Sequence, residues 1–160
     1  MSAPRTSLLR KRASRLAAVQ AMYSEALIEK STLPGLLANQ LLASWADSRT
    51  NDTDDLPHAT QPEVALLNKL IESAQEHHAA INEALEKHIL PSWTRGRMSL
   101  PLLSVLQVFA AETIAYPARS RAVLIDEYTE VAAQLVTDEE LSYAHKIFNL
   151  LLDQLRPEAA

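Results

Sequence analysis

The sequence predicts an all-α protein, and three observations lead to this fold class. Only two of the 160 residues are Gly, while 48% are hydrophobic, so a core of helix-forming residues can be buried. Apolar residues recur every three or four positions along nearly the whole chain, and no useful length alternates with period two. Pro residues and capping sequences divide this pattern into helix-length segments. We therefore expect residues 1–160 to form a single compact helical domain of about six to seven helices.

The first helix is expected from about Ser7 to Glu29. Its apolar stripe consists of Leu9, Ala13, Leu16, Tyr23 and Leu27. A second helix is expected to begin near Ser31 and Thr32, with Pro34 in its first turn. Its buried residues are expected to be Leu37, Leu41 and Trp45. Residues 47–61 are polar, acidic and without periodicity, which predicts a surface loop.

The third helix is expected to follow Pro62 and to stop at Pro91. Its apolar positions alternate by three and four, which predicts one long amphipathic helix with a single buried seam. The seam consists of Val64, Leu67, Ile71, Ala74, His78, Ile81, Leu85 and His88.

The last third of the chain predicts three more helices. Ser99-Leu100-Pro101 opens a segment that is apolar almost all round, so it is expected to be the central buried helix, ended by Pro117. The next helix covers about Ser120 to Val136, and Thr137 with Glu140 forms a capping box for the last one. The apolar stripes of these two helices are Leu124, Tyr128, Val131 and Leu135, and then Leu141, Ala144, Phe148, Leu151 and Leu155.

Several kinds of chemistry have no support in the sequence. The absence of Cys excludes disulfides, thiolate zinc sites and cysteine nucleophiles, and no glycine-rich phosphate-binding motif is present. The acidic run at Asp138 is explained by helix capping, while His78 and His88 lie on the apolar seam without metal-ligand spacing. We expect no enzyme activity, no metal and no cofactor. No apolar stretch approaches the roughly 20 residues of a membrane span, so a cytoplasmic protein without a membrane partner is expected.

Charge is distributed unevenly along the chain. The net charge is −5, yet residues 1–15 carry +5 and no acid, so the rest of the chain carries −10. The cations of this basic head are Arg5, Arg10, Lys11, Arg12 and Arg15. A basic head on an acidic body predicts a local anion-binding surface.

Three of these cations fall on one part of the first helix. Lys11, Arg12 and Arg15 lie within about a third of its circumference, while Arg10 points elsewhere. We expect this ridge to be exposed and to neutralise phosphates, with Gln20 and Tyr23 bonding to or stacking on unpaired bases. A solvated helix face and an organellar transit peptide are the alternatives. The apolar stripe continues without a spacer into the rest of the helix, which opposes the transit peptide.

Five stretches, in this order, resemble the NusB transcription antitermination family. Residues 10–23, RKRASRLAAVQAMY, are similar to its arginine-rich N-terminal signature. The other four are Trp93-Thr94-Arg95 with Arg97 and Met98, then Glu112, then Ile125-Asp126-Glu127-Tyr128 with Val131-Ala132, and finally residues 145–153. Together they cover most of the chain, and their ordered combination is fairly specific.

The resemblance implies a fold and a function. Proteins of this family are all-helical, with two small three-helix subdomains and no catalytic role. They bind the boxA element of ribosomal RNA leader transcripts together with the ribosomal protein NusE, and so act indirectly on the RNA polymerase elongation complex. The RNA-binding residues that it implies here are Lys11, Arg12, Arg15, Gln20, Tyr23, Lys146 and Ile147. The acidic body is a plausible docking face for a basic partner.

The sequence also departs from the family pattern at four positions. Gln107 and Ala133 replace basic residues, Asp126 replaces an asparagine, and Leu150 replaces a glycine, so the last helix is expected to run on smoothly. Arg119 and Arg121 are expected either to restore positive charge or to lie in an ordinary exposed loop. These departures motivate a rival hypothesis, a protein–protein adaptor with the same fold and little RNA affinity. A third hypothesis is an RNA-modifying enzyme of which this chain is only the appended RNA-binding module.

Overall fold

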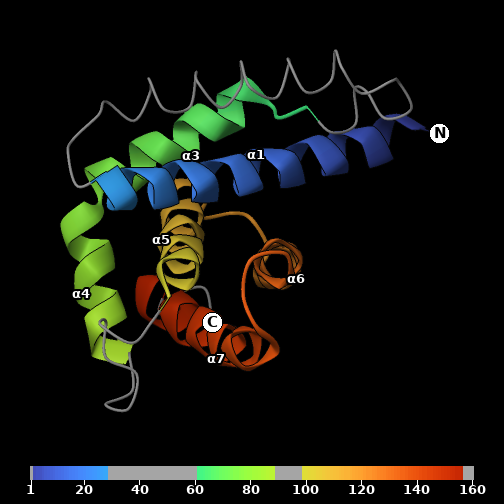
Figure 1. Cartoon of the computed structure of the whole chain (residues 1–160). Helices are drawn as coiled ribbons and strands as arrows, with labels where there is room; N and C mark the ends of the chain where they lie inside the picture. Colours follow the sequence, from blue (N-terminus) through green and yellow to red (C-terminus); the bar gives the residue numbers. More distant parts are fainter. Residues whose placement is uncertain (1, 29–60, 89–98, 157–160) are drawn as a thin grey trace.

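The structure is a computed structural model that describes residues 2–28, 61–88 and 99–156 (Figure 1). These residues form helices and short connections without any strand, which confirms the predicted all-α fold. The helices are α1 (Ser2–Ile28), α3 (Val64–Glu76), α4 (His78–His88), α5 (Leu100–Ala115), α6 (Arg121–Ala133) and α7 (Asp138–Leu155). None of these described helices has the length and apolar composition needed to cross a membrane.

Three expectations concern residues outside the described ranges. They are the helix beginning near Ser31, residues 47–60 of the expected surface loop, and the motif that begins at Trp93. The organisation of the whole chain as one domain, with two helical subdomains, also stays a prediction.

Helix α5 is the centre of the fold, as its all-round apolar sequence predicts. It packs against each of the other five described helices, and Figure 1 shows it running from α1 and α3 to α7. Its N-terminus is capped by Ser99, whose hydroxyl accepts a hydrogen bond from the Leu102 amide at 3.3 Å. It ends two residues before Pro117, whose ring cannot continue a helix. A helix contacted from all sides has no polar face, which explains its composition.

Three aromatic rings from three helices meet in the core. Phe109 of α5 stacks on Phe148 of α7 with ring centroids 4.3 Å apart. The ring of Tyr128 from α6 meets Phe109 edge-on at 5.4 Å. All three side chains are fully buried, and such pairs add to the free energy gained from burial alone.

Helices α6 and α7 begin close to the predicted positions, each after a capping residue. The Ser120 hydroxyl accepts a hydrogen bond from the Val123 amide at 3.0 Å. The Thr137 hydroxyl accepts from the Glu140 amide, and the Glu140 carboxylate accepts from the Thr137 amide, both at 3.2 Å. This is the capping box expected from the sequence. Helix α7 then continues unbroken through Leu150, as the absence of glycine there predicts.

The expectation of one long third helix is wrong. His77 separates α3 from α4, with φ −107° and ψ 23°, and Figure 1 shows the chain changing direction at this point. Helix α3 packs on α1 and α5, whereas α4 packs on α5 and α7. One straight helix with a single buried face could not make both sets of contacts. Two predicted seam residues, Val64 and His78, are consequently exposed.

The buried face of α1 also differs from the predicted stripe. Leu9, Ala13, Leu16 and Tyr23 are only half-buried. The side chains that this helix buries fully are mostly small, namely Ser14, Arg15, Ala17, Ala18, Val19 and Ala21. Small side chains let two helices approach closely, so the face in contact with α3 and α5 is not the one with the largest apolar residues.

Polar contacts join the start of α3 to α1. The Ser14 hydroxyl accepts a hydrogen bond from the Glu63 amide at 2.6 Å. Arg10 donates to the carbonyl oxygens of Gln61 and Pro62 at 3.3 and 3.4 Å. Arg10 therefore points away from the expected ridge, as predicted, and has a structural role.

The aromatic cluster provides a test of this core. Phe109→Ala removes a fully buried ring and is expected to lower the free energy of unfolding by about 3–5 kcal/mol, measured by urea denaturation. The control is Val123→Ala, whose side chain is 44% exposed and for which a change within about 0.5 kcal/mol is expected. Equal effects of the two substitutions would contradict the position of the core.

Candidate nucleic-acid interface and its buried ion pairs

Arg15, expected on an exposed ridge, lies in the core. Its side chain is only 2% exposed and forms a bidentate ion pair with Glu112 of α5, which is fully buried. The Nε and Nη2 atoms of Arg15 each donate to a different carboxylate oxygen at 2.8 Å. The expectation that Arg15 is exposed is wrong because its part of α1 faces α5 rather than solvent.

Glu112 has further partners beside Arg15. The Tyr128 hydroxyl donates to its Oε1 at 2.7 Å. Arg119 Nε lies 3.2 Å from its Oε2, an ion pair by distance that is not aligned as a hydrogen bond. The Arg119 guanidinium also lies over the ring of Tyr116, 4.4 Å from its centroid. One buried carboxylate thus forms ion pairs with two guanidinium groups from different parts of the chain.

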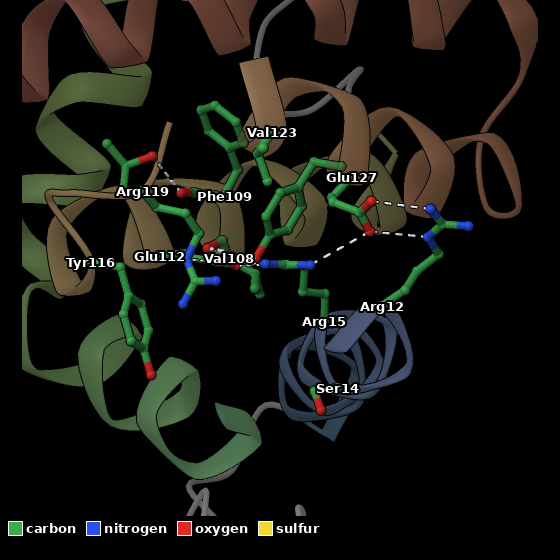
Figure 2. Close-up of polar contacts among 12 residues, drawn as sticks. Arg12, Ser14, Arg15, Val108, Phe109, Glu112, Tyr116, Arg119, Val123 and Glu127 are labelled. Carbon is green, nitrogen blue, oxygen red and sulfur yellow. Dashed lines mark hydrogen bonds and ion pairs between the residues drawn. The ribbon is translucent and has the colours of Figure 1, made fainter. Parts of the chain in front are cut away.

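Arg12 forms a second bidentate pair nearer the surface. Its Nε and Nη2 donate to the two carboxylate oxygens of Glu127 on α6, both at 3.0 Å. Arg15 Nη1 lies 3.5 Å from Glu127 Oε1, so Glu127 contacts both arginines (Figure 2). Exposure rises outward along the chain of pairs, from 0% for Glu112 and 2% for Arg15 to 12% for Glu127 and 34% for Arg12.

These contacts control the charge states in the network. Burial alone lowers the pKa of Arg15, but hydrogen bonds and the charge of Glu112 outweigh it, so the net shift is upward. The hydrogen bonds from Arg12 lower the pKa of Glu127. Burial, with the charge of Glu112, raises the pKa of Tyr128 well above its usual value. At neutral pH both arginines are charged, Glu127 is ionised and Tyr128 is neutral.

The other predicted RNA-binding residues lie on two separate helices. Lys11 is half-buried on α1 and forms no ion pair within the described part of the chain. Gln20 and Tyr23 are also half-buried, and Gln20 is about 140° around the helix from Arg15. Lys146 is exposed on α7, whereas Ile147 is 1% exposed and belongs to the core. Helices α1 and α7 do not contact each other, so these residues are not one compact site.

The arginines near the turn between α5 and α6 are structural. Arg121 Nη2 lies 2.8 Å from Asp153 Oδ1 and also donates to Asn149, which joins the start of α6 to α7. Arg119 is paired with Glu112 as described above, so both arginines hold ion pairs within the protein, whereas the sequence predicted that they restore positive charge or lie in an ordinary exposed loop. Arg156 donates to the carbonyl oxygens of Thr113, Tyr116 and Arg119 at the end of α5.

The histidines do not gather into a metal site within the described ranges. His88 Nε2 lies 2.6 Å from Gln154 Oε1, a contact that joins α4 to α7. His78 is exposed and close to Asn82 on its own helix. His88 is therefore a structural residue, as interpreted from the sequence, while the expected burial of His78 is not found.

The role of Glu112 as the buried counter-ion was missed in the sequence, although a signal for it exists. This acid stands alone inside the apolar segment from residue 102 to residue 115. An acid on a fully buried helix requires a cationic or hydrogen-bonding partner. The sequence does not identify that partner, because Arg15 is 97 residues away.

The fold and the position of the basic helix define a class, the small all-helical proteins that carry a cationic N-terminal helix against a buried central one. The chain belongs to the NusB family, whose model matches residues 12–145. The transcription antitermination protein NusB of Hyphomonas neptunium is 26% identical over 147 residues, which cover 92% of each chain. The family agrees with the expectation of no enzyme activity, because its relatives are named as antitermination proteins.

Solved structures have the same fold. NusB of T. maritima superposes with a TM-score of 0.72 at 19% identity, over 93% of this chain and 94% of that one. A second structure, of antitermination factors NusB and NusE in complex with dsRNA, superposes with a TM-score of 0.69 at 15% identity, over 91% of this chain and 97% of that one. At these identities the similarity concerns the fold.

The buried ion pair gives a stability prediction. Glu112→Gln leaves Arg15 and Arg119 without their shared counter-charge and is expected to lower the free energy of unfolding by about 3–5 kcal/mol in urea denaturation. The control is Glu72→Gln on α3, which removes an exposed pair with Lys69 and is expected to change stability by less than about 0.5 kcal/mol. A loss below about 1 kcal/mol at Glu112 would contradict the network.

The lowered pKa of Glu127 predicts a pH dependence. A carboxylate with a depressed folded-state pKa stabilises the protein above its unfolded value of about 4.3, and this stability is lost as pH falls through the folded-state pKa. The difference in free energy of unfolding between the wild type and Glu127→Gln is therefore expected to be largest at neutral pH and to disappear in acid. Urea denaturation of both proteins from about pH 7 to pH 3 measures it. A difference independent of pH would contradict the ion pair.

Proposed function

We propose that this chain is an RNA-binding transcription antitermination factor that acts on ribosomal RNA leader transcripts, at a single-stranded boxA-type element, together with a NusE-type ribosomal protein. The observation that carries the proposal is the family match over residues 12–145. A relative that covers 92% of the chain is named as a transcription antitermination protein. An effect on the RNA polymerase elongation complex would be exerted through this assembly.

The RNA surface that we propose is smaller than the ridge expected from the sequence. Its candidate residues on α1 are Lys11, Arg12, Gln20 and Tyr23, which spread over about half of the helix circumference, with Lys146 on α7 as a separate contact. The cations neutralise phosphates, while the tyrosine ring and the glutamine amide can stack on or bond to unpaired bases. Arg15 and Ile147 are left out because both side chains are buried. Arg15 supports the surface from below through Glu127.

The partner is proposed from charge and from the relatives. NusE accompanies NusB in one of the solved complexes with the same fold. A basic ribosomal protein is complementary to exposed acids of this chain such as Asp138 and Glu139 at the start of α7. Bound there, it would cover negative surface that repels RNA and would add its own contacts.

A second candidate function is the protein–protein adaptor with little RNA affinity. The observation that favours it is that three arginines of the basic head form contacts within the protein. Arg10 binds backbone carbonyls, Arg12 binds Glu127 and Arg15 binds Glu112. Fewer cations are left for phosphates than the sequence suggests. RNA binding by the isolated protein is therefore expected to be weak.

A titration of labelled RNA tests the proposal. Single-stranded boxA-type leader RNA and a duplex of the same sequence are titrated with the protein, with and without NusE, and affinity is measured by fluorescence anisotropy. We expect weak binding alone and tighter binding to the single strand with NusE, with RNA tightening the protein pair by the same factor. Lys11→Ala is expected to weaken binding and to reduce the salt slope by about 0.7, the loss of one phosphate contact.

A matched lysine supplies the control. Lys87 is exposed on α4, which does not contact α1, so Lys87→Ala is expected to leave RNA affinity unchanged. If NusE binds this chain equally well with and without RNA, and RNA never joins the complex, the adaptor hypothesis is correct. Binding of neither partner would overturn both candidates.

A further inference from the structure

The Arg12 guanidinium uses only one of its edges within the protein. Its Nε and Nη2 face Glu127, in the side-on geometry that fixes the plane of a guanidinium. Figure 2 shows the remaining terminal nitrogen of Arg12 directed away from Glu127. This Nη1 atom has no hydrogen-bond partner in the described part of the chain, and the side chain is 34% exposed. No described residue uses its two N–H donors, which can bind an oxygen atom from a ligand.

The orientation of Arg12 is set from the core outward. Glu127 is 12% exposed and is also contacted by Arg15, which is held by the fully buried Glu112. Each charged group in this series is fixed by the one beneath it, so little side-chain freedom is left at Arg12. A cation that is already ordered loses less conformational entropy when it binds a phosphate.

We propose that Glu127 is a positioning residue for RNA, which holds Arg12 so that its outer edge binds one phosphate of the strand. The inference rests on the proposed function and adds to it an acidic residue that strengthens binding to a polyanion. Glu127 does not touch RNA in this arrangement. It acts through Arg12 alone.

Simple electrostatics predicts the opposite sign, which makes the inference testable. Removal of an acid near a phosphate-binding surface lowers repulsion and should tighten RNA binding. Glu130 provides the matched comparison, because it is exposed one turn further along α6. The hydrogen bonds with Glu127 are the main cause of the raised Arg12 pKa, whereas Glu130 adds to it by charge alone. Glu127→Ala and Glu130→Ala therefore remove the same charge, but only the first removes the support.

The experiment measures affinity for single-stranded leader RNA by anisotropy, in the presence of NusE, at several salt concentrations. Arg12→Ala is expected to weaken binding roughly tenfold, as for one charged hydrogen-bonded contact. Glu127→Ala is expected to weaken it about threefold to tenfold and to flatten the salt slope as Arg12→Ala does. Glu130→Ala is expected to leave affinity unchanged or to tighten it by up to about twofold. In an Arg12→Ala background, Glu127→Ala is expected to cause no further weakening.

Folding is controlled separately, since Glu127 also contacts Arg15. Each variant is titrated well below its own thermal midpoint, and helix content is checked by circular dichroism. Glu127→Gln, which keeps one hydrogen-bond acceptor, is expected to lie between the wild type and Glu127→Ala. A merely structural effect would weaken binding equally in the Arg12→Ala background, and this would overturn the inference.

The remaining outcomes separate the inference from the proposed function. If the wild type binds RNA but Glu127→Ala and Glu130→Ala both tighten binding, Glu127 is only a repelling charge, so the inference fails while the function stands. The same holds if Arg12→Ala has no effect. If the wild type does not bind RNA even with NusE, the proposed function fails and the inference fails with it.

Discussion

The ion pair between Arg15 and Glu112 is the constraint on which the rest of the structure depends. Both charges lie in an apolar core, where either one alone would cost several kcal/mol. The carboxylate also accepts from Tyr128 of α6 and lies beside Arg119, so a single buried acid joins α1, α5, α6 and the turn that follows α5. A shift of α1 along α5 would separate the pair, so this contact sets the register between the two helices.

The same pair determines how much of the basic head reaches the surface. Arg15 is used in the core, Arg10 holds the start of α3, and Arg12 is shared between Glu127 and solvent. A count of positive residues therefore overstates the number of phosphate contacts that this helix can make. Arg12, which does reach the surface, is held in place by Glu127, and an ordered side chain loses less conformational entropy on binding.

Much of the fold could be predicted because its signals are local. The caps at Ser99, Ser120 and Thr137 depend on residues within one turn, and the apolar α5 segment is recognisable without knowledge of its neighbours. The break at His77 could not be predicted, because neither Pro nor Gly stands there and the change of direction comes from packing against α1 on one side and α7 on the other. The candidate site was only partly predictable. Arg12 is at the surface as expected, but Arg15 is not.

The sequence by itself determined that this protein is all-helical, where several of its helices begin and end, and which helix is central. It also determined that five cations without any acid stand in residues 1–15. Periodicity, capping and composition are properties of neighbouring residues, so no tertiary structure is needed to read them. Only the tertiary structure decided which cations remain for a ligand. Glu112 and Glu127 follow Arg15 by 97 and 112 residues, so local sequence does not reveal these ion pairs. A charged side chain is neutralised or oriented by the partner that the fold places within about 3 Å of it.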